Sequence, residues 1–291
     1  METGLLLMTK QNTEPLKLIN NNLILATPNH YTLSIQLSLD GFSFCIYNNF
    51  ETCLEVLQHH YFKAKSPEAL LSQVERIFAS EPLLNKPFNK VTVSHVNNLS
   101  SLVPKSLFDK NQLKSYLDYS VKTLENDFFD FDELTVINAV NVYIPYVNVN
   151  NYLIDKFGSF TFNHFSSLLI EQLISQNSLS NDAQLFAHIS ETHFEIIVIQ
   201  SQKLLLYNTF NYQTKEDFIY YILFVAEQLA LNPNTFNLFL LGAISSSDKL
   251  FAIAYKYVKN VKLYNFALKY KPLFTLSESQ QRQFFCLLHQ Q

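Results

Sequence analysis

An alternation of apolar and polar residues, repeated in two parts of the chain, constrains the fold more than any other feature of this sequence. In residues 31–40 apolar side chains occupy every second position, which is typical of a strand with one buried face. Asp40 and Gly41 follow, a pair that strongly favours a tight hairpin, and the alternation continues to Ile46. A third strand is expected at 52–62, so the segment predicts three antiparallel strands joined by short turns.

Helices and strands are expected to alternate after these strands. Ser66 and Pro67 predict the start of a helix, with serine as the N-cap and proline at the first helical position. The later elements of the first half are expected at 91–95 (strand), 113–121 (helix), 136–147 (strand) and 150–176 (helices separated at Gly158). Residues 1–30, rich in Asn, Thr and Pro, are expected to form a loose lead-in.

The same order of elements returns after the polar segment 176–182, which we interpret as the junction between domains 31–180 and 181–291. Strands are expected at 184–190, 193–199, 203–210, 236–243 and 261–266, with helices after Thr214, after Ser245 or Ser246, and at 280–288. Three antiparallel strands followed by strands reached through helices form a mixed five-stranded sheet in each half. Two unrelated α/β domains are the alternative interpretation of this pattern.

Charge and hydropathy argue against two classes of partner. The chain carries 21 Lys+Arg against 25 Asp+Glu without a clustered basic run, so we expect no nucleic-acid binding. Uninterrupted apolar stretches are too short for a signal core or a membrane span, which predicts no membrane insertion. Cys45, Cys53 and Cys286 form no CxxC pair and are expected to be reduced thiols. We therefore expect a cytoplasmic protein.

The duplicated element order, with the hairpin LSIQLSLDGFSFCIYN at 33–48, resembles the actin-like ATPase fold of actin, Hsp70-type chaperones, sugar kinases and pilus-assembly scaffolds. The chain also resembles an uncharacterised bacterial family of unknown function assigned that fold. The resemblance implies an α/β protein of duplicated ribonuclease H-like domains, each a mixed five-stranded sheet with helices on both sides. It also implies a nucleotide in the cleft between them, where an Asp-x-Gly turn in each first hairpin supplies amides for phosphate and a carboxylate for magnesium.

The sequence departs from this pattern at the loops that would hold the nucleotide. The positions that would line the cleft are Gln36, Ser38, Asp40, Gly41, His188, Ser190 and Gly242. Gln36 and His188 stand where the resemblance places aspartates, and serines stand where it places glycines. Glycine lets a backbone approach phosphate closely, and 4 glycines in 291 residues are too few to build three such loops. The sequence therefore argues against ATP hydrolysis.

We expect a catalytically degenerate actin-like protein that holds no cofactor and acts as a cytoplasmic scaffold or interaction module for a protein partner. One alternative is a nucleotide-dependent phosphotransferase or ATPase with diverged loops, in which Asp40 would organise Mg-ATP. Another is a small-metabolite-binding module that uses the same cleft, lined by Gln36, Ser38, His188 and Ser190.

Other polar groups give weaker indications. His188, Glu191 and His193 surround a turn, but without an adjacent third ligand they favour a structural histidine pair over a metal site, and we expect no metal. The carboxylates at 130–133 lack the spacing of a calcium loop and indicate an ordinary loop or sheet edge. The apolar residues at 284–288 are expected to pack on their own domain, with docking of a partner as the alternative.

Overall fold

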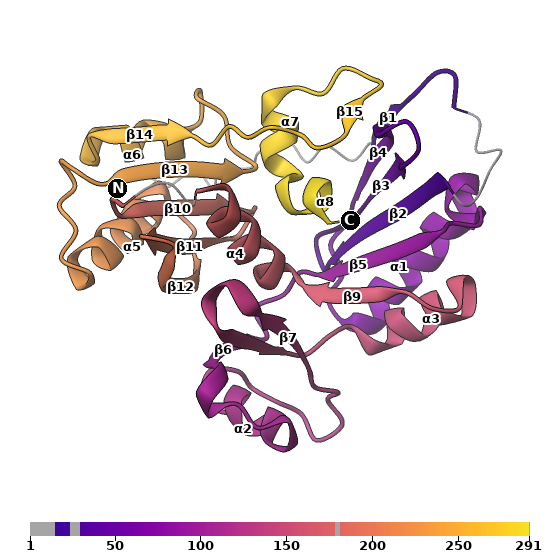
Figure 1. Ribbon diagram of the computed structural model, residues 1–291, viewed down its shortest axis with the longest axis horizontal. Helices are drawn as coiled ribbons and strands as arrows, with labels where there is room; N and C mark the ends of the chain where they lie inside the picture. Colours follow the sequence, from indigo (N-terminus) through magenta and orange to yellow (C-terminus); the bar gives the residue numbers. More distant parts are fainter. Residues whose placement is uncertain (1–14, 24–29, 178–180, 291) are drawn as a thin grey trace, which may run out of the picture.

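The computed structural model describes residues 15–23, 30–177 and 181–290, which form two large mixed sheets, a small sheet and their covering helices (Figure 1). The first large sheet has the order β1-β4-β3-β2-β5-β9. Its strands are β1 (Leu16–Ile19), β2 (Tyr31–Ser38), β3 (Gly41–Asn48), β4 (Cys53–Tyr61), β5 (Lys90–His95) and β9 (Thr161–His164), with β15 (Lys271–Pro272) paired to β4. Strands β2, β3 and β4 are antiparallel neighbours, whereas β5 and β9 run parallel to β2.

The second large sheet repeats this arrangement with the order β12-β11-β10-β13-β14. Its strands are β10 (Gln184–Ile189), β11 (His193–Gln200), β12 (Lys203–Asn211), β13 (Asn237–Gly242) and β14 (Asn260–Leu263). Here too, three antiparallel strands are followed by two strands parallel to the first of them. The predicted duplication of a mixed sheet is confirmed, since β4-β3-β2-β5-β9 repeats the order of the second sheet, but β1 and β15 extend the first sheet to seven strands instead of the expected five.

The fifth strand of the first sheet is β9, not the predicted segment 136–147. That segment contains β8 (Ala139–Tyr143), the centre of a separate sheet with β6 (Ser100–Pro104) and β7 (Asp130–Leu134). The position of β9 was wrongly assigned to helix, because four residues that run directly into the next helix show no clear periodicity.

The predicted lead-in is also corrected where the structure describes it. Strand β1 pairs antiparallel with β4, and its Leu16 and Leu18 pack against the apolar cluster on that side of the sheet. The rest of the lead-in, at 1–14 and 24–29, lies outside the described residues.

Helices cover the outer face of each large sheet. They are α1 (Pro67–Ser80) and α3 (Val147–Phe157) on the first sheet, and α5 (Lys215–Gln228) and α6 (Lys249–Tyr257) on the second. The short helical elements elsewhere are α2 (Leu113–Leu117) and the 3-10 turns Pro82–Asn85, Lys105–Leu107, Lys110–Gln112 and Thr135–Ile137. Among the described residues, every helix is too short or too polar to cross a bilayer.

The predicted helix starts hold in two cases of three. Ser66 and Thr214 cap α1 and α5 as expected. However, α6 starts after Asp248 rather than after Ser245, whose hydroxyl lies 2.7 Å from the Asp248 carboxylate. The structure thus corrects the serine cap, because that hydroxyl is used within the loop. Gly158 does end α3, at a φ of 76°.

The helices that close each half pack between the two sheets (Figure 1). Helix α4 (Phe165–Gln176) follows β9, yet its Leu169 and Leu173 pack with Ile197 of the second sheet. Helices α7 (Glu278–Gln283) and α8 (Phe285–His289) follow β14, yet Leu287 packs with the first sheet. The terminal helix packs on its own domain as expected, through Phe285 and Cys286, but it also packs on the first sheet, because its apolar residues face in both directions.

We predict that shortening a buried side chain of α4 or of α8 destabilises the whole molecule. Leu169 and Leu287 are fully buried, so Leu169→Ala and Leu287→Ala should each lower the free energy of unfolding by about 2–5 kcal/mol. Urea unfolding followed by circular dichroism measures this, with Leu124→Ala at a 62% exposed position as the control. Loss of only one of two separate transitions would contradict the mutual dependence of the halves.

Candidate functional site

The two first hairpins, β2–β3 and β10–β11, approach each other where the halves meet. Burial acts to lower the pKa of His193 on β11, but its hydrogen bond and charge interaction with Glu195 raise that pKa overall. The Asp40 carboxylate, at the β2–β3 turn, is close enough to add a smaller contribution of the same sign. An ion pair of 2.9 Å between Lys63 Nζ and Glu191 Oε1 connects the same two regions. The structure therefore brings together the hairpins that the sequence assigns to one cleft.

The β2–β3 turn uses its polar groups internally. The Asp40 amide donates to the Ser38 hydroxyl at 3.1 Å, and that hydroxyl donates to the Gly41 carbonyl at 3.2 Å. A Cβ on Gly41 would lie 2.6 Å from the His59 ring, so glycine fits the packing of the hairpin itself. Gln36 is half-buried and lies between Ser43 and Ser94 in register.

Gln290, the last described residue, covers the polar face of β2 at Ser34, away from the β2–β3 turn. Ser34 donates its hydroxyl hydrogen to the backbone carbonyl of Gln290, and the Thr92 hydroxyl donates to that carbonyl at 3.3 Å. The Gln290 side chain donates in turn to the Ile35 carbonyl at 3.3 Å. On this strand face Thr32 and Ser34 are buried, whereas Gln36 and Ser38, nearer the turn, are half-buried.

In the second hairpin a buried carboxylate lies between two histidines. Glu195 Oε2 is 3.0 Å from His188 Nδ1, and Glu195 Oε1 is 3.4 Å from His193 Nε2. Burial opposes the charged carboxylate, but the contacts with both histidines outweigh it and lower the pKa of Glu195 to about 2. The His188 ring also packs on Phe165, with centroids 4.9 Å apart. His188 is therefore held in place by Glu195, whereas Glu191, which lies between the two histidines in the sequence, pairs with Lys63.

A buried polar centre that the sequence analysis missed lies at the carboxyl ends of β5 and β9. His164 Nδ1 is 2.7 Å from the Ser166 hydroxyl, and its Nε2 is 3.1 Å from the Asn97 carbonyl. Burial lowers the pKa of His95 to about 3 and that of His164 to about 4, so both rings are neutral at pH 7. Ligands of open α/β sheets bind at such strand ends, but recognising this site requires the position of β9.

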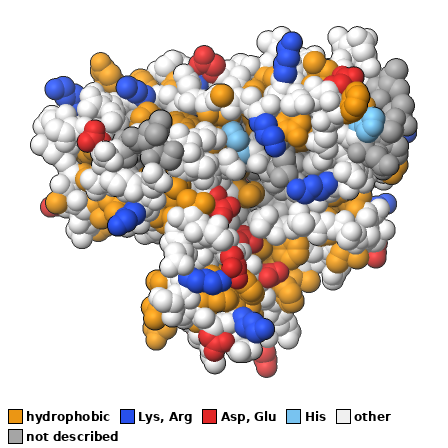
Figure 2. All heavy atoms as spheres, viewed as in Figure 1, with side chains coloured by type: hydrophobic (Ala, Val, Ile, Leu, Met, Phe, Trp, Pro, Cys, Tyr) orange, Lys and Arg blue, Asp and Glu red, His pale blue; other side chains and the backbone are white. Residues whose placement is uncertain are grey.

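The carboxylates at 130–133 lie on β7, an edge strand of the small sheet, as one of the predicted options had it. Asp132 accepts from the His164 amide at 2.8 Å, and burial raises the pKa of its carboxyl. Glu133 pairs with Lys105 at 2.6 Å. On the face in Figure 2, acidic side chains gather near the junction of the small sheet with the large ones, while Lys and Arg are scattered.

Ser190 and Gly242 occupy the remaining positions assigned to the cleft. The Ser190 amide donates to the His193 carbonyl at 2.9 Å and so closes the β10–β11 turn. Gly242 has a φ of 88°, and a Cβ there would lie 2.2 Å from the Ile189 carbonyl oxygen. Glycine at 242 is therefore required by the close approach of β13 to β10, whatever binds in the cleft.

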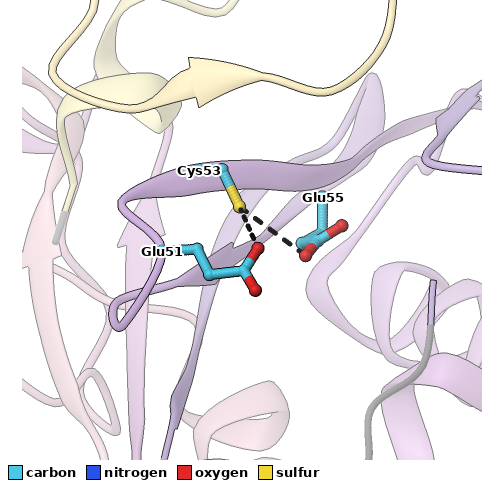
Figure 3. Close-up of side chains that lie close together, drawn as sticks. All are labelled: Glu51, Cys53 and Glu55. Carbon is cyan, nitrogen blue, oxygen red and sulfur yellow. Dashed lines mark hydrogen bonds between the residues drawn. The ribbon is translucent and has the colours of Figure 1, made fainter. Parts of the chain in front are cut away.

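One group of potential metal ligands lies elsewhere, after the β3–β4 turn (Figure 3). The Cys53 thiol is 3.6 Å from Glu55 and 4.0 Å from Glu51. Burial and both carboxylates raise the pKa of Cys53 to about 12, which keeps the thiol protonated, whereas a metal binds the thiolate. Glu55 also accepts from Asn20 at 2.7 Å. In this structure the Cys53 thiol therefore acts as a hydrogen-bond donor between two carboxylates.

We predict that Glu195→Gln lowers the free energy of unfolding by about 2–4 kcal/mol at pH 6. The Glu195 contribution is present above its ordinary pKa of 4.5 and is lost as the pH falls toward 2. The His193 contribution is present below its ordinary pKa of 6.5 and is lost as the pH rises through its elevated folded value. Urea unfolding across this range tests both, with exposed Glu125→Gln as the control; a loss independent of pH would contradict the charge assignment.

A matched pair of glycine variants tests the role of position 242. Gly158→Ala places a side chain at positive φ in open space, so it should cost about 1–2 kcal/mol. Gly242→Ala adds a clash with the Ile189 backbone, so we expect a clearly larger fall in thermal stability. Equal losses in the two variants would show that the approach of β13 to β10 imposes no constraint.

Comparison with known proteins places this geometry in a wider group. A family model described as "Protein of unknown function (DUF3822)" matches residues 20–261. A Bacteroides thetaiotaomicron protein with an actin-like ATPase fold and unknown function is 26% identical, with a TM-score of 0.75 over 81% of this chain and 91% of that one. PilM, in the PilM–PilN type IV pilus biogenesis complex, is 11% identical, with a TM-score of 0.56 over 90% and 97% of the chains. No curated protein matches the chain.

Proposed function

The chain belongs to the DUF3822 family of proteins of unknown function and has an actin-like ATPase fold, and we propose that it acts as a cytoplasmic scaffold that does not hydrolyse ATP. The environment of His188 carries this proposal. The resemblance to actin-like ATPases places an aspartate at position 188, where a free carboxylate would join the magnesium shell. This chain has there an imidazole that is hydrogen-bonded to Glu195. The nearby Glu195 carboxylate is itself occupied by two histidines.

The backbone donors of both turns support the same conclusion. Phosphate binding in such loops relies on amide hydrogens that point outward. Here the Asp40 amide donates to Ser38, and the Ser190 amide donates to His193 within its own hairpin. A nucleotide would have to break these bonds to gain its own, which favours an empty phosphate subsite.

A scaffold role also agrees with the use of this fold elsewhere. PilM shares the fold and forms a complex with PilN. This parallel is one of fold alone and therefore only makes a partner-binding role reasonable. The partner of this chain must be inferred from its own surface.

We predict no saturable binding of Mg-ATP by isothermal titration calorimetry and no phosphate release above the buffer rate. The Asp40→Ala variant should behave like the wild type in both assays, because Asp40 organises no metal under this proposal. Asp155→Ala, at an exposed position of α3, is the matched control.

Turnover that Asp40→Ala abolishes and Asp155→Ala preserves would contradict the proposal and establish the nucleotide-dependent alternative. Saturable binding of a non-phosphorylated metabolite that His188→Ala abolishes would instead establish the metabolite-binding alternative.

A further inference from the structure

An open apolar groove of about 550 Å³ lies between α5 and α6, and none of its lining residues belongs to the paired hairpins. Ile219, Tyr220 and Leu223 line it from α5, while Ile253 and Tyr257 line it from α6. Ile219 and Leu223 are four positions apart on α5, as are Ile253 and Tyr257 on α6, so each pair lies on one face of its helix, with Tyr220 beside Ile219. The two stripes face each other across the groove.

The groove leaves large apolar side chains in contact with water. Tyr220 is 60% exposed and Tyr257 is 49% exposed, although both helices pack their other faces tightly on the second sheet. Phe224, next to Tyr220 on α5, is 41% exposed and stacks on it with ring centroids 6.1 Å apart. These three exposed rings lie in the groove or directly beside it, which is the kind of arrangement found at contact sites.

The charge around the groove differs from that of the chain. Lys215, Lys249 and Lys256 line the groove against a single carboxylate, Glu216, although the whole chain has a net charge of −4. Lys215 and Lys249 stand in the first turns of α5 and α6, and Lys256 stands in the last turn of α6. Basic side chains therefore flank the apolar stripe toward both of its ends.

We propose that this groove binds an acidic amphipathic helix of a partner protein. Apolar side chains on one face of that helix pack on Tyr220, Leu223 and Tyr257, and carboxylates beside them meet the lysines. The inference rests on the proposed function, because it identifies the kind of partner that the scaffold holds. Complementary charge sets the orientation and the rate of association, while the apolar anchors supply most of the affinity.

The dimensions of the groove fit a short helix. The nine residues of α6 extend about 13 Å, or two and a half helical turns. A partner helix of that length offers anchors at positions i, i+4 and i+7, which matches two stripes of similar length.

The test uses two stapled helical peptides and the full chain. One fluorescent peptide carries leucine at i, i+4 and i+7 with four flanking glutamates, and the other carries lysines in place of the glutamates. We expect the glutamate peptide to bind at least about tenfold more tightly by fluorescence anisotropy, and added salt to reduce this difference. The doubly substituted variant Lys249→Glu, Lys256→Glu should reverse the preference, and both positions are exposed, so folding is retained.

A matched pair of variants on α6 distinguishes binding in the groove from non-specific binding to exposed apolar side chains. Tyr257→Ser lies in the groove and should weaken binding of the glutamate peptide about tenfold. Tyr255→Ser, 66% exposed on the same helix but outside the groove lining, should leave it unchanged. Equal affinity for both peptides, or no binding of either, would overturn the proposal. So would concentration-dependent self-association that Tyr257→Ser abolishes, since a second copy would then be the occupant.

The groove and the scaffold proposal fail separately. A chain that hydrolyses ATP and still prefers the glutamate peptide would overturn the scaffold without ATPase activity and leave the groove assignment standing. A chain with neither ATP turnover nor peptide preference would overturn the groove assignment alone.

Discussion

The rest of the structure depends on one constraint: the last helix of each half packs on the sheet of the other half. A sheet with one apolar face covered still exposes the other, and a stable layered domain covers both. Helices α1, α3, α5 and α6 cover the outer faces, whereas α4 and α8 cover inner faces and contact each other. Phe285 and Cys286 join the α4 cluster, while Phe284 and Leu288 join the first sheet. Neither half has a complete core alone.

This packing also determines the chemistry of the site. Helix α4 begins at His164, whose ring accepts from the Ser166 amide as an N-cap, and the next residue, Phe165, packs on His188. Residues 164 and 165 therefore connect the small sheet to the second hairpin, since the His164 amide donates to Asp132 and Phe165 contacts His188. Many polar groups in this region are bonded to one another, although among the described residues the buried His95 Nε2 and Asn141 Oδ1 atoms have no hydrogen-bond partner.

The sequence predicted elements wherever an alternation or a cap ran long enough to be distinct. Strands β10 to β13 and the caps of α1 and α5 are of this kind. It failed at β9, where four residues precede a helix without a break, and at the destination of α8. A helix that is apolar on all sides must be buried on all sides, but only the tertiary structure decides against which sheets. The polar centre at His95 and His164 was missed for the same reason, since it exists only once β9 is in place.

The positions of the glycines bear on whether the fold binds a nucleotide. Gly41 fits against the His59 ring, Gly158 ends α3 at positive φ, and Gly242 permits the approach of β13 to Ile189. Each glycine of the described residues thus has a reason within the packing of its own half. Retention of Gly242 therefore does not indicate a nucleotide-binding loop, because the close approach of β13 to Ile189 of β10 would require it in a protein that binds no nucleotide. With that glycine explained by packing, the resemblance to a working ATPase rests on topology alone, and topology does not determine chemistry.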